Sequence, residues 1–168
     1  MPWFLDPNGR GARRYRLAAH EAGHACMALH LGCRLGRLRL GGYLDRHVQG
    51  GMACSSDAPI SVQDNLLITL AGPAAEVLAG GGPSERWQRD LLDARQVAGA
   101  VCRTPEQVED LIDRHYQRAL EILAEPRLWA AVEAVALALT EARNDALDGR
   151  TAARIAREAA AMVEASDR

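Results

Sequence analysis

Residues 12–31, ARRYRLAAHEAGHACMALHL, decide the fold of this 168-residue chain. Their apolar side chains, among them Leu17, Met27 and Leu31, recur every three or four positions, which is the spacing of one face of an α-helix. Gly32 follows directly, and glycine is common just after a helix end. We therefore expect a helix over about residues 12–31, and its apolar face predicts that other elements pack against it.

The composition also favours helices. Hydrophobic residues make up 48% of the chain and aromatic residues only 4%, so small and unbranched apolar side chains must form the core. Such side chains suit close-packed helices better than a sheet of aromatic and β-branched residues. A chain of this length can form one domain with its own core. We predict a single, mainly α-helical domain over residues 1–168.

Capping residues, apolar periodicity and proline or glycine breaks predict further helices. They span about residues 61–80, 84–102, 104–125, 127–143 and 148–165, with a turn at Asn144-Asp145 between the last two. Between the first two helices, glycines and alternating apolar residues over 36–56 predict two short strands, the second at about 51–55. We therefore expect a small two- or three-stranded β-sheet beside the first helix.

Charge and hydropathy exclude several classes of protein. The net charge is −2 with both signs interspersed, whereas nucleic-acid binding requires a basic surface. No stretch approaches the ~20 apolar residues of a membrane span, and the first eleven residues lack the apolar core of a signal peptide. The four cysteines form no CxxC pair and are expected to be small buried thiols. We expect a soluble, cytoplasmic protein with no nucleic-acid partner.

One motif in the first helix carries chemistry. His20-Glu-Ala-Gly-His24 is a complete HExxH pattern, and histidines four residues apart project from the same helix face. Two imidazoles at this spacing can share one tetrahedral metal ion, and zinc suits such ligands best. Glu21 lies beside them, where a carboxylate can take a proton from a metal-activated water. The motif predicts a zinc site with His20 and His24 as ligands and Glu21 as the general base.

A catalytic zinc site needs a third protein ligand and one open position. The residue chemistry leaves three acidic candidates on later helices, namely Glu76, Asp90 and Asp93. The remaining histidines are weaker candidates. His30 is six residues past His24 and points to another side of the helix, whereas His47 in a glycine-flanked loop and His115 among charges are expected to be solvated.

Three segments together resemble the peptidase domain of FtsH-type ATP-dependent zinc metalloproteases. They are His20-Glu-Ala-Gly-His-Ala25, Leu70-Ala-Gly-Pro-Ala-Ala-Glu76-Val-Leu-Ala-Gly80 and Arg89-Asp90-Leu-Leu-Asp-Ala94. Their order and approximate spacing agree with that family, and the resemblance extends over about residues 15–160. Three motifs in order are more specific than HExxH alone, which recurs on unrelated folds.

The resemblance implies a zinc ion held by His20, His24 and Asp90. It places Glu76 in the family's Ala-Ala-Glu segment, where the residue would support the site or the helix packing without binding the ion. Asp93, one turn beyond Asp90, is the fallback ligand. The sequence departs from the family where Pro73 enters a helix and where residues 84–89, SERWQR, replace a glycine-rich lead into the aspartate.

The function that follows is hydrolysis of peptide bonds by a zinc-dependent endopeptidase. The family also carries an ATPase module, but no GxxxxGK[ST] loop is present in this sequence. The expected substrate is therefore a flexible or unfolded polypeptide. The resemblance also implies an ATPase that acts in trans and a homo-oligomer like the family's ring. The alternative is a catalytically idle module that binds a metal ion or a protein partner.

Overall fold

The computed structural model describes residues 9–40 and 51–166 and is mostly helical with a small antiparallel sheet, as predicted. The elements follow in this order along the chain: α1 (Arg10–His30), β1 (Arg34–Arg39), β2 (Gly51–Ser55), α2 (Val62–Leu78), α3 (Glu85–Gly99), α4 (Pro105–Leu123), α5 (Pro126–Glu141), the 3₁₀ helix η2 (Arg143–Asp145), β3 (Ala146–Leu147) and α6 (Gly149–Ser166). The predicted helices are confirmed to within a few residues at each end.

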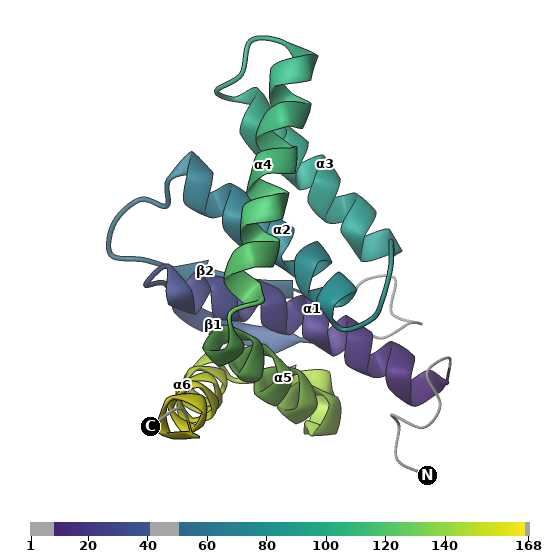
Figure 1. Cartoon of the computed structure of the whole chain (residues 1–168), viewed down its shortest axis with the longest axis vertical. Helices are drawn as coiled ribbons and strands as arrows, with labels where there is room; N and C mark the ends of the chain where they lie inside the picture. Colours follow the sequence, from purple (N-terminus) through teal and green to yellow (C-terminus); the bar gives the residue numbers. More distant parts are fainter. Residues whose placement is uncertain (1–8, 41–50, 167–168) are drawn as a thin grey trace.

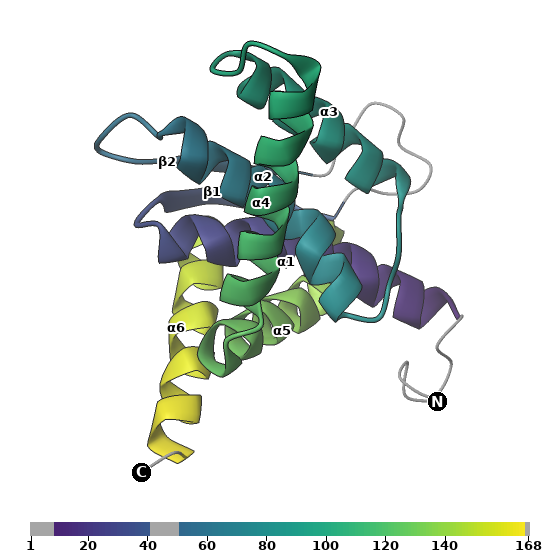
Figure 2. The ribbon, with the colours of Figure 1, turned by 45° about the horizontal axis from the view of Figure 1, so that its top comes forward.

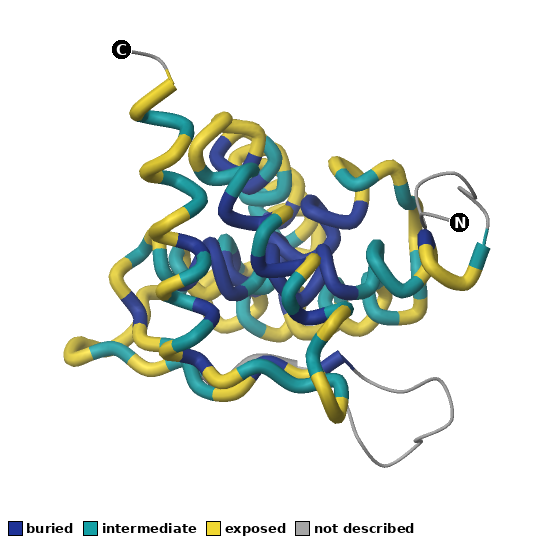
Figure 3. Tube along the Cα trace, turned by 90° about the horizontal axis from the view of Figure 1, so that it is seen from below, coloured by how far each residue is buried: buried dark blue, intermediate teal, exposed yellow. Residues whose placement is uncertain are grey.

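Helix α1 forms the centre of the molecule. It packs against α2 on one side and α5 on another, and the sheet lies beside it (Figure 1). Its middle section, from Ala18 to Ala28, is almost entirely buried, which Figure 3 shows as a dark blue core surrounded by exposed segments. Because half of these buried residues are alanines, neighbouring helices can approach closely. The HExxH motif lies within this buried section.

The sheet has three strands in the order β2-β1-β3, and both pairings are antiparallel. The two predicted strands are present, with Leu35 opposite Cys54 and Arg39 opposite Gly51. The sequence did not predict the position of the third strand, Ala146–Leu147, because two residues are too few to show a periodic pattern. Strand β2 lies at one edge of the sheet, so one side of its backbone is free of pairing within the sheet.

Side-chain caps begin three of the helices. Ser61, Ser84 and Thr104 each accept a hydrogen bond from the backbone N–H three residues later, at the starts of α2, α3 and α4. They stand at the first positions of three of the predicted helices, and each satisfies a backbone donor that a helix start leaves without a partner. At the other end of the chain, the predicted turn at Asn144 is confirmed by a φ of 61° there.

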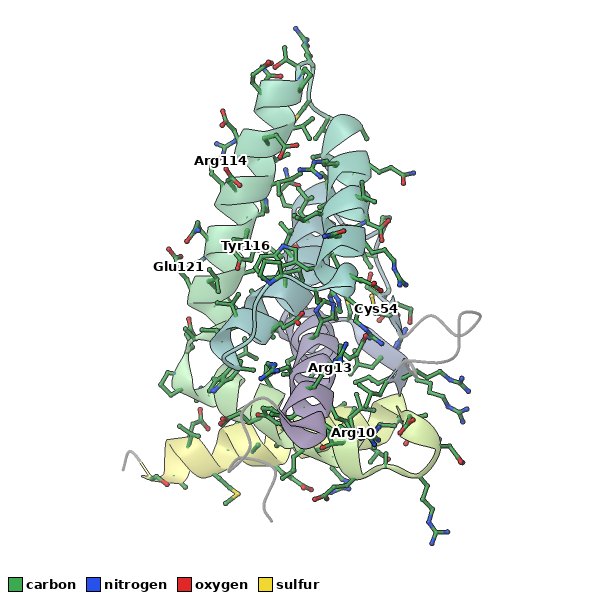
Figure 4. All side chains as sticks on the ribbon, turned by 90° about the vertical axis from the view of Figure 1, so that its right-hand side faces the viewer. Arg10, Arg13, Cys54, Arg114, Tyr116 and Glu121 are labelled. Atoms are coloured by element: carbon green, nitrogen blue, oxygen red, sulfur yellow. The ribbon has the colours of Figure 1, made fainter. Side chains whose placement is uncertain are left out.

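Helices α3 and α4 form a hairpin that projects from the rest of the molecule (Figure 1). Tyr116 of α4 lies on the side facing α3, whereas Arg114 and Glu121 point outward (Figure 4). The ring of Trp87 on α3 lies 5.7 Å from that of Tyr116, so this tryptophan packs between the two helices. Helix α6 extends away on the opposite side (Figure 2). Among the described helices, none is both long and apolar enough to cross a bilayer.

Candidate metal centre

The two histidines of the motif lie side by side on the face of α1 that meets α2. His20 is 2% exposed, and the side chain of His24 is also largely covered. Their rings meet edge to face with centroids 4.9 Å apart, and the two Nε2 atoms are 3.2 Å apart. The i, i+4 spacing therefore brings one nitrogen from each ring to the same point, as the sequence predicts.

The other nitrogen of each ring donates a hydrogen bond. Nδ1 of His24 lies 2.7 Å from the carbonyl oxygen of Ile68, and because a carbonyl only accepts, this nitrogen carries the proton. Nδ1 of His20 lies 3.1 Å from Oε2 of Glu76, which accepts in the same way. With both protons on Nδ1, the two Nε2 atoms present their lone pairs to each other. That arrangement suits a cation held between them.

Asp90 of α3 supplies the third converging atom. Its Oδ2 lies 2.9 Å from Nε2 of His20 and 3.4 Å from Nε2 of His24. When both facing nitrogens are unprotonated, this buried oxygen has no hydrogen-bond partner within the described residues. An orphaned buried carboxylate oxygen is costly unless something else satisfies it.

The spacing of these three atoms fits a small tetrahedral ion. Ligand atoms 2.0–2.2 Å from zinc at tetrahedral angles lie roughly 3.3–3.6 Å apart. The three observed separations, from 2.9 to 3.4 Å, are within a few tenths of an ångström of that range. His20, His24 and Asp90 form the group in the described part of the chain that could hold a metal ion.

Protonation of the metal-free site follows from the same contacts. Burial lowers the pKa of His20, but hydrogen bonds to Asp90 and Glu76 outweigh burial and raise it to about 9. Burial raises the pKa of Asp90, yet the two histidines lower it overall to about 2. A negative carboxylate beside basic imidazoles is a site that attracts a cation, whether a proton or a metal ion.

Gly72 gives the imidazoles room. A Cβ at this position of α2 would lie 2.7 Å from Nε2 of His20 and closer still to the ring of His24. Side chains do not approach that closely, so only glycine allows α2 to pass so near the two Nε2 atoms. Helix α2 continues through Pro73 beside it.

Glu76 supports the site without joining the cluster, as the resemblance implies. Its Oε2 accepts hydrogen bonds from Nδ1 of His20 and from Oγ of Ser84, the latter at 2.9 Å. The carboxylate is buried and faces the far nitrogen of the ring, away from Nε2. Such a contact fixes the ring orientation and makes its free nitrogen more basic. Ser84 therefore caps α3 and holds Glu76 at the same time.

Glu21 is buried next to His20 and pairs with Arg86 of α3. Its side chain is 3% exposed, and its Oε1 accepts a hydrogen bond from a guanidinium nitrogen of Arg86, whose side chain is 18% exposed. Sequence reasoning expected the carboxylate near the metal but did not anticipate its cationic partner.

The remaining candidate ligands lie elsewhere. Asp93 is exposed on α3, and His30 is exposed at the last residue of α1. His47 lies outside the described residues. His115 donates from Nδ1 to the carbonyl oxygen of Leu111 and lines a shallow pocket of about 270 Å³ between α2 and α4. That pocket shares no residue with the His20–His24–Asp90 cluster, so it is not the metal centre.

Two residues of this site, Gly72 and Arg86, were missed from the sequence, although each leaves a signal. A glycine inside a helix destabilises it by about 1 kcal/mol relative to alanine, and a close approach can be the reason for keeping it. Arg86 precedes Asp90 by four residues, so both side chains must lie on the same face of α3.

No family model matches the chain, and no curated protein matches it.

Proposed function

We propose that this protein is a zinc-dependent endopeptidase of the FtsH type that hydrolyses peptide bonds in flexible or unfolded polypeptides. The observation that carries the proposal is the convergence of Nε2 of His20, Nε2 of His24 and the orphaned Oδ2 of Asp90. Two imidazoles and one carboxylate are one of the ligand sets of catalytic zinc, which keeps its fourth position for water or substrate.

Zinc is the metal that best fits these donors. Imidazole nitrogen suits zinc, copper and nickel, whereas magnesium and calcium prefer shells made entirely of oxygen. A zinc ion held here would supply Lewis acidity, which lowers the pKa of water to about 7 and polarises the scissile carbonyl group.

Glu21 is the residue that would move the proton. Its carboxylate would accept a proton from the attacking water and return it to the nitrogen of the departing amine. Glu21 follows His20 directly in α1 and is close enough for its charge to raise the pKa of that histidine. A carboxylate in this place is not needed merely to bind a metal ion, which favours a hydrolytic role over storage or structure.

Strand β2 offers a means of binding a polypeptide without reading its sequence. It is an edge strand, so an extended peptide could pair with its free side through backbone hydrogen bonds. Peptides methylated on backbone nitrogens lose those donors and should be cut more slowly than matched unmodified peptides. Equal rates for both would count against this mode of binding.

The FtsH-type assignment rests on the three sequence segments and on the place of Asp90. If the likeness extends to assembly, the chain would form a homo-oligomer and would accept substrates unfolded by an ATPase acting in trans. Without such a partner, cleavage would be restricted to chains that are already flexible.

One observation favours the competing function, an idle module that binds a metal ion or a partner. Arg86 engages the Glu21 carboxylate that the reaction would need. The Glu21→Gln variant distinguishes the two functions. Its cleavage of a fluorescently labelled unfolded polypeptide is measured at saturating zinc. An endopeptidase loses cleavage in this variant, by at least about 100-fold for a missing general base, while it still binds zinc. Wild-type protein that is loaded with zinc and cuts nothing would support the idle module.

A further inference from the structure

The ion pair between Arg86 and Glu21 joins two helices that otherwise meet little. Helix α3 packs against α2 and α4, and its backbone has few contacts with α1. Two side chains of α3 nevertheless reach α1. Asp90 approaches the two histidines, and Arg86, one turn earlier on the same face, pairs with Glu21.

The first turns of α3 have no fully buried residue, and their aromatic contact, between Trp87 and Tyr116, joins them to α4 and not to α1. The fully buried residues of this helix are Ala94 and Ala98, and both follow Asp90. The contacts that this part of α3 makes with α1 and α2 include Ser84 to Glu76, Arg86 to Glu21 and Asp90 to the histidines, and all three are polar. Removing one of these contacts therefore shifts Asp90 relative to the histidines more than it would if apolar packing joined α3 to α1.

The Arg86–Glu21 contact is also the more strongly buried of the ion pairs that α3 makes through arginine. Arg95 of the same helix pairs with Glu109 of α4, but those two side chains are 46% and 50% exposed. An exposed pair contributes little, whereas an arginine taken from a carboxylate that is 3% exposed leaves a buried charge without its partner.

We propose that Arg86 is a positioning residue of the metal centre. By pairing with Glu21 it holds the start of α3 against α1, and this contact sets Asp90 beside His20 and His24. The same contact fixes the Glu21 carboxylate, so this half of the inference rests on the proposed peptidase function. The first half concerns metal affinity alone and does not depend on whether the protein cleaves peptides.

The test is a zinc titration of metal-free protein in competition with a chromophoric chelator. Arg86→Ala should weaken zinc binding by about 10- to 100-fold, the usual effect of losing a residue that orients a ligand. Arg86→Lys should recover part of this loss because it restores the positive charge. Arg95→Ala is the matched control, since it breaks the exposed ion pair of the same helix, and it should leave zinc affinity unchanged.

A double-mutant cycle asks whether Arg86 acts through Glu21. If the ion pair is the route, Arg86→Ala combined with Glu21→Ala should weaken zinc binding no more than the worse of the two single changes. Fully additive losses would overturn the proposal, as would an unchanged affinity in Arg86→Ala. The absorption spectrum of the Co²⁺ form supplies a second readout, which should change in Arg86→Ala and not in Arg95→Ala.

The outcomes also separate this inference from the proposed function. Wild-type protein that binds zinc and shows the coupling but cuts no peptide supports the positioning role and contradicts the peptidase. An active wild type whose Arg86→Ala variant binds zinc equally well contradicts the positioning role alone. A wild type that binds no zinc contradicts both. If Arg86→Ala does not fold, Arg86→Gln is judged by the same criteria because it keeps most of the side-chain volume.

Discussion

Nε2 of His20 and Nε2 of His24 face each other at 3.2 Å, and Nδ1 of each ring donates a hydrogen bond on the opposite side. Two lone pairs at this distance repel unless a cation lies between them or beside them. Asp90 completes the arrangement with a buried oxygen that has no hydrogen bond within the described residues when both rings are neutral. The geometry therefore forms a group on α1 and α3 that could hold a metal ion.

Gly72→Ala should disrupt the site. The added methyl group would overlap both imidazoles, so either ring must leave its place, and forced overpacking of a core costs about 1–3 kcal/mol. We expect a lower melting temperature and a loss of zinc affinity in the chelator competition. Gly99→Ala is the control, because a Cβ at that position of α3 meets nothing within 4 Å. Undiminished zinc binding in Gly72→Ala would contradict the described packing.

Ser84→Ala should weaken both the fold and the metal site. Its hydroxyl group caps α3, and a lost cap costs about 1 kcal/mol. The same hydroxyl donates to Glu76, which orients His20, so zinc affinity should fall by up to about 10-fold. Ser61→Ala removes the equivalent cap from α2 and should cost similar stability with no change in zinc affinity. An equal change of zinc affinity in Ser84→Ala and Ser61→Ala would argue against the contact between Ser84 and Glu76.

The metal-free protein should become less stable as the pH rises from about 6.5 to about 9. Burial lowers the pKa of His20, but hydrogen bonds to Asp90 and Glu76 raise it overall from 6.5 to about 9. The folded state therefore binds this proton more tightly than the unfolded chain. The resulting stabilisation is complete below about pH 6.5 and is lost as the pH passes through about 9.

Urea unfolding of chelator-treated protein at several pH values measures this trend. His20→Asn should remove the part of the pH dependence that His20 contributes. With zinc present the direction reverses, because the ion must displace the proton and binds more tightly as the pH rises. A metal-free stability that is unchanged over this interval would show that the contacts of His20 differ from those described.

Local sequence patterns predict the elements of this fold well, because most of them depend on neighbours within one helix. The caps at Ser61, Ser84 and Thr104 act over three residues, and the pairing of His20 with His24 depends only on helical spacing. The two-residue strand β3 carries no such pattern. It forms because Leu147 meets Leu38 of a distant strand.

The site is predictable only in part, for a similar reason. Asp90 lies 66 positions beyond His24, and residue chemistry alone left Glu76 and Asp93 as equal alternatives. The resemblance to a family singled out Asp90, and the structure places Asp93 on the exposed side of α3. The contacts of Arg86 and Gly72 depend on how α3 and α2 lie against α1, which no spacing within a single helix encodes.

The most direct test of the account is the metal content of wild type, Asp90→Ala and Asp93→Ala, purified identically and measured by elemental analysis. The account predicts about one zinc ion per chain in wild type and in Asp93→Ala, and a loss or sharp weakening of zinc binding in Asp90→Ala. Full zinc occupancy in Asp90→Ala, or no zinc in wild type after reconstitution, would contradict the His20–His24–Asp90 centre.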